Sequence, residues 1–234
     1  MISLFYSFQS RKTALILKQK ESERILTKEF TESQIEIREE TLKNISWELH
    51  DNIGQLLTLA KIQIQNIAPE TPELIETQNI ISKSLSELRI LSKVINPEFI
   101  KTISLHEAIE IEINRLNRLN FIKAYFITEG ELFLLNKKQE IIIFRMLQEF
   151  FSNTIKHAQA SKLEVSITYK EKSIHLEAKD DGIGFDILDK SNLGIGLQSM
   201  RNRGKLIGAE VNLISNKNEG TFISITYTKH HENI

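Results

Sequence analysis

A long stretch without helix breakers constrains this chain more than any other feature of its sequence. Residues 12–67 contain no proline, and Gly54 is their only glycine. They are rich in Glu, Lys, Gln and Leu, which favour helix. From residue 42 apolar side chains recur at steps of three and four: Leu42, Ile45, Leu49, Ile53, Leu56, Ala60, Ile64 and Ile67. This spacing predicts a long helix with one apolar stripe.

A second helix is expected to pair with the first. Pro69 disfavours helix at the preceding residue, whereas Thr71 can cap a new helix and Pro72 suits its first turn. Apolar residues mark one face of this second helix, which ends near Asn96: Leu74, Ile81, Leu85, Leu88 and Ile95. Two helices with one stripe each cannot bury both stripes alone. We therefore expect residues 42–96 to form a helical hairpin that dimerises into a four-helix bundle.

The remaining chain mixes helices with strands. After a linker at 97–103, helices are expected at 104–119, 137–157 and 197–207, and strands at 122–128, 162–170, 174–180, 211–213 and 221–228. Apolar and polar residues alternate cleanly in 162–170, as in a half-buried strand. The fold class is therefore α+β, with an α/β sandwich over residues 104–228, a tail at 229–234 and a coiled coil at 1–41.

Composition excludes several classes of protein. The net charge of the 234 residues is −1, so no global field recruits nucleic acid, and no direct nucleic-acid partner is expected. No cysteine is present to form a disulfide or a thiolate metal site, which is compatible with a reducing cytosol. The sequence contains no P-loop, no His-Glu-x-x-His and no Gly-x-Ser-x-Gly motif.

The N-terminal end suggests a membrane link. The first eight residues are mostly apolar but too short to span a bilayer. Basic residues follow at Arg11, Lys12, Lys18 and Lys20, a pattern like the cytoplasmic exit of a membrane helix. We hypothesise that a membrane sensor precedes Met1 in a longer receptor whose cytoplasmic portion is this chain. A reading frame without hydrophobic segments upstream of Met1 would exclude that.

One helix face gathers polar side chains of different chemistry. Glu149, Asn153, Lys156 and His157 lie at offsets of four, seven and eight, which places them on one side of a helix. An amide oxygen together with phosphate oxygens suits Mg²⁺, and a lysine suits phosphate. A solvated helix face is the alternative.

A carboxylate on a buried strand face favours a ligand site. Asp180 has the same parity as Ile174, Leu176 and Ala178, so it points toward the core. Such a carboxylate is costly unless it accepts hydrogen bonds, and an adenine amino group would be a suitable donor. Glycine pairs follow at Gly182 and Gly184 and at Gly194 and Gly196. Alone either pair could be a turn; in this order the elements predict a nucleotide pocket.

A histidine beside the apolar stripe is a candidate nucleophile. His50 follows Leu49 of the stripe, Asp51 is its neighbour, and Gln55 is one turn beyond Asp51. A neutral imidazole can attack an electrophile, and an adjacent carboxylate can orient the ring and accept its proton. The alternative is a surface histidine beside a charge.

The motifs of residues 104–228 together resemble the GHKL ATPase domain shared by histidine kinases, gyrase and the Hsp90 chaperones. Glu149-x-x-x-Asn153-x-x-Lys156-His157-Ala158 is similar to its N box, Asp180-x-Gly182-x-Gly184 and Gly194-x-Gly196-Leu197 to its glycine boxes, and Gly220-Thr221 to the start of its last core strand. The resemblance implies a GHKL/Bergerat sandwich that binds ATP and Mg²⁺. It implies that Asp180 recognises adenine, Asn153 holds Mg²⁺, Lys156 and His157 approach the phosphates, and Glu149 orients metal or water. Gly182, Gly184, Gly194, Gly196, Leu197 and Thr221 complete the implied binding set.

The segment around His50 resembles the His-Asp-x-x-Gly-Gln-x-Leu motif of histidine kinases of the nitrate/nitrite-sensor and desaturase-thermosensor type. The resemblance implies that His50 is autophosphorylated, that Asp51 is its general base, and that Asp51 with Gln55 dephosphorylates the partner. Ser46-Trp47 stand where members often carry a basic residue.

The implied function is that of a two-component sensor histidine kinase. A homodimer would pass phosphate from His50 to an aspartate in the receiver domain of a response regulator, most often one with a helix-turn-helix output. Residues 1–41 would transmit the signal, and the location would be cytoplasmic. A phosphatase-dominant, nucleotide-gated module without autokinase activity is one alternative, and a plain GHKL ATPase such as a chaperone is another.

Overall fold

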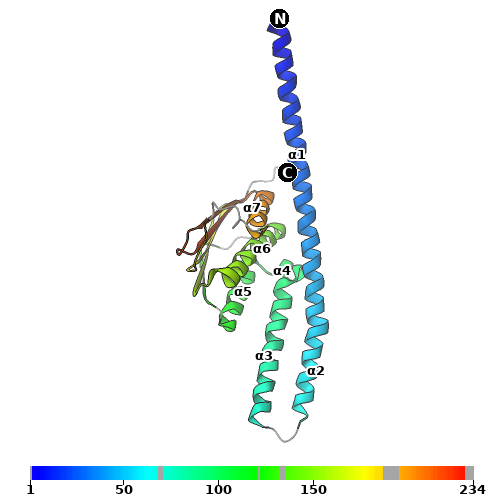
Figure 1. Ribbon diagram of the computed structural model, residues 1–234, viewed down its shortest axis with the longest axis vertical. Coiled ribbons are helices and arrows are strands. Elements are labelled where there is room, and N and C mark those ends of the chain that lie inside the picture. The colour runs from blue at the N-terminus through cyan, green and yellow to red at the C-terminus, as the bar shows by residue number, and fades with distance from the viewer. Residues whose placement is uncertain (1, 68–70, 121, 132–134, 187–194, 230–234) are drawn as a thin grey trace. The chain divides into compact units, whose positions relative to one another are not determined.

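The computed structural model describes residues 2–67, 71–120, 122–131, 135–186 and 195–229 (Figure 1). Its helices are α1 (Ile2–Glu48), the π-helical turn η1 (Leu49–Ile53), α2 (Gly54–Gln65), α3 (Pro72–Ile95), α4 (Pro97–Thr102), α5 (Leu105–Leu119), α6 (Lys137–Asn153), the π-helical turn η2 (Thr154–Ala158) and α7 (Ile195–Ile207). Its strands are β1 (Lys123–Glu129), β2 (Lys162–Lys170), β3 (Ser173–Asp180), β4 (Glu210–Ser215) and β5 (Thr221–Thr228).

The chain divides into two compact units, Met1–Arg38 and Glu39–Ile234. The first unit is helical over its described residues and belongs to α1. Among all the residues described, no helix is both long and apolar enough to cross a membrane.

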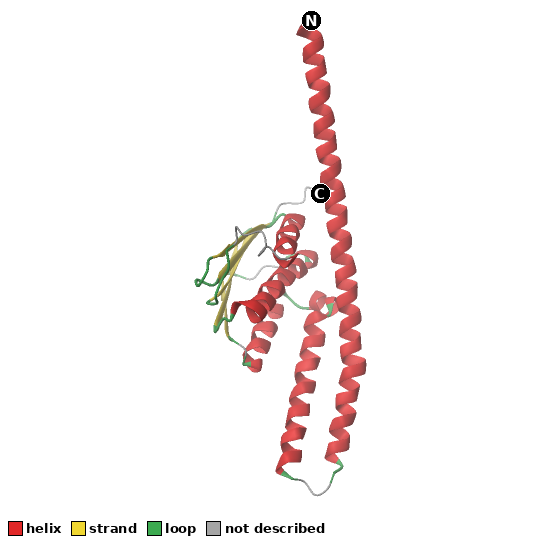
Figure 2. Cartoon of the chain, viewed as in Figure 1, coloured by secondary structure: helices red, strands yellow, loops and turns green. Residues whose placement is uncertain are grey.

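The second unit begins with the predicted helical hairpin. The end of α1, η1 and α2 follow one another without a break, and α3 lies beside α2 (Figure 2). Thr71 caps α3 as expected, since its hydroxyl accepts the N–H of Leu74 at 3.3 Å. Within the predicted linker, α4 forms because the Asn96 side chain accepts the N–H of Glu98 at 2.9 Å and Pro97 occupies the first helical position.

The turn η1 shifts the apolar stripe of the first hairpin helix. A π turn holds one residue more than an α turn, so positions beyond it are rotated about the axis. Ile53 and Leu56 of the predicted stripe are 44% and 63% exposed, whereas Gly54 and Leu57 are partly buried. A Cβ on Gly54 would lie 3.4 Å from Cδ2 of Leu88 in α3. The helices therefore approach closely at this glycine.

The hairpin leaves much apolar surface uncovered in a single chain. No residue of α2 is fully buried, and only three residues of α3 are. The exposed apolar side chains of the hairpin include Ile45, Ile53, Leu56, Leu59, Ile62, Ile75 and Ile80. This surface is consistent with the expected pairing of two hairpins.

After the hairpin, the second unit contains a five-stranded sheet in the order β1-β2-β3-β5-β4. The first two strands are parallel, and the other neighbours are antiparallel. The parallel pair is joined through α6, as a parallel crossover requires. This mixed arrangement of helices and a mainly antiparallel sheet confirms the predicted α+β class.

The core lies between one face of the sheet and the helices α5, α6 and α7 (Figure 1). In β2 and β3 the buried residues alternate as their sequences predict. The largest fully buried side chains include Phe144, Leu147, Phe151, Leu163, Ile167 and Leu176. Since burying one such side chain contributes about 1.5–3 kcal/mol, this layer fixes α6 firmly on the sheet.

Candidate functional site

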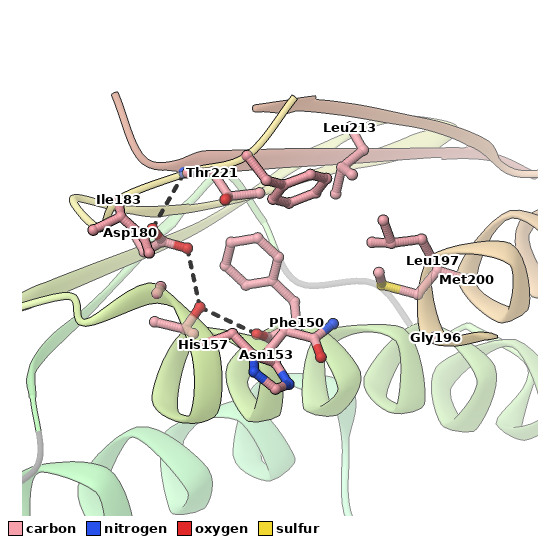
Figure 3. Close-up of a pocket in the computed structure, with 14 residues that line it drawn as sticks. Phe150, Asn153, His157, Asp180, Ile183, Gly196, Leu197, Met200, Leu213 and Thr221 are labelled. Carbon is pink, nitrogen blue, oxygen red and sulfur yellow. Dashed lines mark hydrogen bonds between the residues drawn. The ribbon is translucent and has the colours of Figure 1, made fainter. Parts of the chain in front are cut away.

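A pocket of about 380 Å³ opens between α6, α7 and one end of the sheet (Figure 3). Its lining consists of Phe150, Asn153, Thr154, His157, Ala158, Asp180, Ile183, Gly184, Phe185, Gly196, Leu197, Met200, Leu213 and Thr221. Seven of these residues belong to the set predicted from the sequence: Asn153, His157, Asp180, Gly184, Gly196, Leu197 and Thr221.

Asp180 is the buried carboxylate of this pocket. It ends β3 and is 2% exposed, so the prediction that it points to the core side is confirmed. Its Oδ1 accepts the backbone N–H of Gly182 at 2.9 Å and that of Thr221 at 3.2 Å. Its Oδ2 lies 3.1 Å from the hydroxyl of Thr154. The carboxylate is thus held rigidly and can still accept a hydrogen bond from a ligand amino group.

The glycines after β3 allow close backbone approach. A Cβ on Gly182 would lie only 2.4 Å from the carbonyl oxygen of Ala158 in η2. Gly184 has φ of +55°, and a Cβ there would lie 2.0 Å from the carbonyl oxygen of Asn216. Gly184 lines the pocket and Gly182 supports the turn behind it, while Gly194 lies outside the described residues.

The polar stripe of α6 is only partly brought to the pocket. Asn153 and His157 line it, whereas Lys156 is exposed and does not. The stripe was predicted on regular helix geometry, but the helix continues as the π turn η2 after Asn153, which changes the register. Glu149 lies behind the lining, where a Cβ on Gly196 would be 2.2 Å from its Oε1.

Two parts of this pocket were not predicted from the sequence: the hydroxyl of Thr154 and the apolar wall formed by Phe150, Met200 and Leu213. Thr154 lies 3.1 Å from both the Asp180 carboxylate and the carbonyl oxygen of Phe150. Phe150, Met200 and Leu213 supply apolar surface of the kind that accepts a flat aromatic ring. The sequence contains one indication of Thr154: it is a polar residue that follows the apolar Phe150 by one helical turn.

Asp181, beside the pocket, fastens the end of β3 to the start of β2. The Ser161 hydroxyl lies 2.6 Å from its Oδ2, and the backbone N–H groups of Ser161 and Lys162 each donate to Oδ1 at 2.8 Å. These hydrogen bonds, the hydroxyl first, lower the pKa of the Asp181 carboxyl.

His50 is accessible and paired. It lies in η1, and its Nδ1 is 2.8 Å from Oδ1 of Asp51; the two side chains are 68% and 55% exposed. When Nδ1–H donates to the carboxylate, Nε2 carries the lone pair. Two cavities border the ring. One is lined by Ser46, Trp47, Asp51, Ser92, Lys93, Asn96 and Phe99, and the other by Gly54, Gln55, Thr58, Leu59, Leu88 and Arg89. Asp51 lines the first of these cavities and Gln55 lines the second, and His50 borders both.

Ser46 is buried, whereas its neighbour Trp47 is exposed. Ser46 is 4% exposed and its hydroxyl donates to the carbonyl oxygen of Ser92 at 2.9 Å, which joins α1 to α3. Trp47 is 61% exposed and lines the cavity beside His50. Lys93 borders the same cavity and lies 5.8 Å from the centre of the Phe99 ring. A basic group thus reaches this cavity from α3.

No cluster of three histidine or carboxylate side chains suited to a metal occurs among the described residues. A metal at the pocket would use the amide oxygen of Asn153 together with oxygens of a bound ligand. The Asn153 amide, which lines the pocket, fits that role because Mg²⁺ prefers oxygen ligands and accepts phosphates as partners.

The chemistry of this pocket agrees with the comparison to known families. Residues 138–231 match the family described as Histidine kinase-, DNA gyrase B-, and HSP90-like ATPase. Every residue that lines the pocket falls within that range. This part of the chain is therefore a GHKL-type ATP-binding domain, as its motifs predicted.

Most of the chain is similar in sequence to two staphylococcal sensor proteins. It is 28% identical over 210 residues to the oxygen sensor histidine kinase NreB of Staphylococcus carnosus, covering 87% of this chain and 60% of that protein. It is 30% identical over 195 residues to the sensor protein VraS of Staphylococcus saprophyticus, covering 81% and 56%. The chain thus spans less than two thirds of the length of these relatives.

One solved structure similar to this chain is that of the blue-light activated histidine kinase EL346 of Erythrobacter litoralis. The identity is 18%, the TM-score is 0.48, and the match covers 82% of this chain and 61% of the other.

Proposed function

We propose that this chain is the phosphoacceptor and ATP-binding portion of a two-component sensor histidine kinase. The observation that carries the proposal is the exposed imidazole of His50, bonded to Asp51 at 2.8 Å, in the same chain as a GHKL-type pocket. The name of the relative NreB, an oxygen sensor histidine kinase, supports the same activity.

In the proposed pocket Asp180 accepts the adenine amino group, and Ile183, Met200 and Leu213 contact the ring. Gly196, Leu197 and Thr221 border the nucleotide, and Gly182 and Gly184 form the turn after β3. Gly194 completes the proposed binding set. Asn153 holds Mg²⁺, His157 and Lys156 approach the phosphates, and Glu149 orients metal or water. Bound Mg²⁺ would neutralise charge on the phosphate oxygens. The buried carboxylate and the apolar wall support this assignment.

In the proposed reaction Nε2 of His50 attacks the γ-phosphorus of ATP. The nitrogen–phosphorus bond forms as the bond to the bridging oxygen breaks, and ADP leaves with that electron pair. Asp51 takes up the Nδ1 proton, so the ring ends neutral. The 2.8 Å contact between Nδ1 and Asp51 supports this role.

Several partners follow from this proposal. Two chains would pair through residues 42–96, and the phosphate of His50 would pass to an aspartate in a receiver domain with a helix-turn-helix output. Asp51 and Gln55 would assist removal of that phosphate later. Residues 1–41 would carry the signal from a membrane sensor before Met1, and the chemistry would take place in the cytoplasm. The relatives' description as sensors supports this order of events.

The test is incubation with γ-labelled ATP and Mg²⁺. The protein should gain a phosphate that is labile in acid and stable in base, and His50→Ala should abolish labelling. His175→Ala, at a half-exposed histidine of β3, is the matched control and should label normally. Label that persists in His50→Ala would refute the site.

The phosphatase-dominant alternative is not favoured, because the relative NreB is named a histidine kinase. Assays of Gln55→Ala and His50→Gln separate the two activities. We expect the first to label but lose phosphatase activity toward a phosphorylated regulator. The second should not label. Steady ATP hydrolysis without any phosphoprotein would instead support a plain ATPase.

A further inference from the structure

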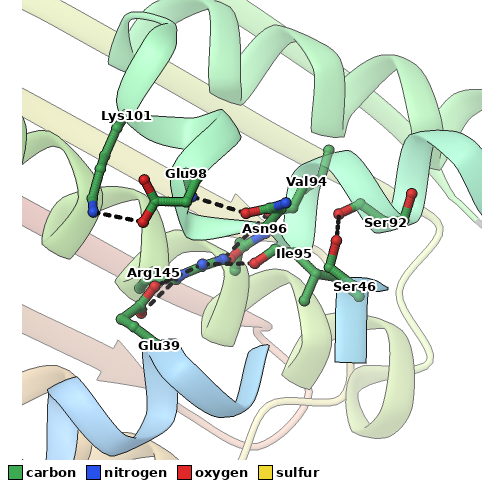
Figure 4. Close-up of polar contacts among 10 residues, drawn as sticks. Glu39, Ser46, Ser92, Val94, Ile95, Asn96, Glu98, Lys101 and Arg145 are labelled. Atoms are coloured by element: carbon green, nitrogen blue, oxygen red, sulfur yellow. Dashed lines mark hydrogen bonds and ion pairs between the residues drawn. The ribbon is translucent and has the colours of Figure 1, made fainter. Parts of the chain in front are cut away.

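A buried arginine joins the ATP-binding domain to the helical hairpin. Arg145 belongs to α6 and is 4% exposed. Its guanidinium forms a two-pronged ion pair with Glu39 of α1, with Nη2 2.8 Å and Nε 3.0 Å from carboxylate oxygens (Figure 4). We call Arg145, Glu39, Val94, Ile95 and Gln148 the Arg145 junction.

The same guanidinium also binds the end of α3. Nη2 donates to the carbonyl oxygen of Ile95 at 2.9 Å, and Nη1 lies 3.3 Å from that of Val94. The last carbonyls of a helix lack partners within the helix, so a cation there is favourable. Gln148 accepts from Nη1 at 2.6 Å. One side chain thus ties α6 to α1 and to the C-terminal turn of α3.

The junction lies close in sequence to both predicted reaction centres. Arg145 precedes Glu149 and Asn153 by four and eight residues on α6, and Val94 and Ile95 follow Lys93, which lines the cavity beside His50. The lining of the nucleotide pocket shares no residue with either cavity that borders His50, within the part of the chain that the structure describes. Phosphoryl transfer requires the reacting atoms to approach to about 3–3.5 Å.

We propose that the Arg145 junction holds the kinase in a resting arrangement, in which the ATP-binding domain is restrained away from His50. Arg145 acts as a positioning residue, and its ion pair with Glu39 couples it to movements of α1. A shift of α1 that withdraws the Glu39 carboxylate leaves the guanidinium without its counter-charge. That loss frees the ATP-binding domain to reorient. This inference rests on the proposed histidine kinase activity.

Glu39→Gln is the sharpest variant, because it removes the counter-charge and leaves Arg145 and its bonds to α3 in place. Glu40→Gln is the matched control: Glu40 is the next residue of α1 and is exposed. We expect Glu39→Gln to raise the initial rate of autophosphorylation about fivefold or more, the lower range of allosteric couplings. Glu40→Gln should match the wild type. An unchanged or lower rate in Glu39→Gln would overturn the proposal.

A second readout does not depend on kinase activity. The chain contains no cysteine, so spin labels can be attached through Gln63→Cys on α2 and Lys170→Cys at the end of β2, both exposed positions. Labelled chains mixed with excess unlabelled chains report distances within one chain. Glu39→Gln should broaden that distance distribution, and an unaltered distribution would count against the junction. If the wild type fails to label with ATP, the proposed function fails, while the distance measurement still tests the restraint.

Discussion

At the scale of residues, Asp180 is a buried charge whose position favours a binding site. Its carboxylate sits at the end of a strand whose other inward residues are apolar, and it accepts backbone N–H groups from Gly182 and Thr221. A fold does not need an ionisable group at such a place for packing, because an apolar side chain would fill the space at lower cost. The parity of β3 alone predicted this burial.

Asp180→Asn should weaken nucleotide binding by about tenfold or more, because a hydrogen bond to a charged group is worth about 1.5–3 kcal/mol. The amide also places an N–H donor where the carboxylate accepts. Calorimetric titration with ADP and Mg²⁺ measures the change, and Glu164→Gln on the exposed side of β2 is the control. Equal affinities for Asp180→Asn and the wild type would contradict the role of Asp180.

Asp181 makes stability depend on pH. Its pKa is lowered in the folded state, chiefly by the Ser161 hydroxyl, so the ionised carboxylate stabilises the fold at neutral pH. That contribution is present above the unfolded pKa and is lost as pH falls through the lowered folded pKa. Asp181→Asn should therefore melt below the wild type at pH 7, and the gap should shrink below about pH 4. Melting curves across pH test this, and a gap independent of pH would contradict it.

At the scale of elements, α3 contributes more to the surroundings of His50, the proposed phosphoacceptor, than the sequence indicated. The chain lacks the basic residue that related motifs often carry before the histidine, and Ser46 instead bonds to Ser92 of α3. The close approach of the two helices brings Lys93 into the cavity that borders His50. A contact of this kind depends on pairing across the hairpin, which no local motif encodes.

Lys93→Ala should slow autophosphorylation about threefold to tenfold, since a nearby cation in a partly exposed site contributes about 1 kcal/mol toward phosphate. Lys83→Ala, at an exposed position on the same helix, is the matched control. Initial rates at saturating ATP make the comparison. Equal rates in the two variants would show that Lys93 does not assist the phosphate.

At the scale of the whole molecule, the sequence predicted the class of fold but not its junctions. The hairpin, the alternating strands and the α+β class followed from periodicity, which is local. The helix α4 lies within the predicted linker at 97–103, because Pro97 suits the first turn of a helix as well as the end of one. The Arg145 junction was out of reach because Glu39 and Arg145 are 106 residues apart. Thr154 was missed because its partner Asp180 lies on a strand.

The apolar surface of the hairpin predicts how many chains assemble. Leu56 is 63% exposed in one chain, and burial of a leucine is worth about 1.5–3 kcal/mol. Leu56→Glu should therefore weaken the dimer by at least about tenfold. Sedimentation over a range of concentrations measures this, with Gln63→Glu, at an exposed position of α2, as the control. A wild-type chain that stays monomeric at high concentration would contradict the predicted dimer.

The π turns have a consequence for how this chain tolerates change in length. The turn η1 at His50 holds a surplus residue between α1 and α2, whereas η2 at His157 forms the end of the helix that α6 begins. Deleting one residue within η1 would let this turn become regular α-helix. The apolar stripe would then be continuous, but His50 would point in a different direction. The chain should therefore accept such a deletion as a folded protein and lose its reaction, which separates the demands of folding from those of chemistry.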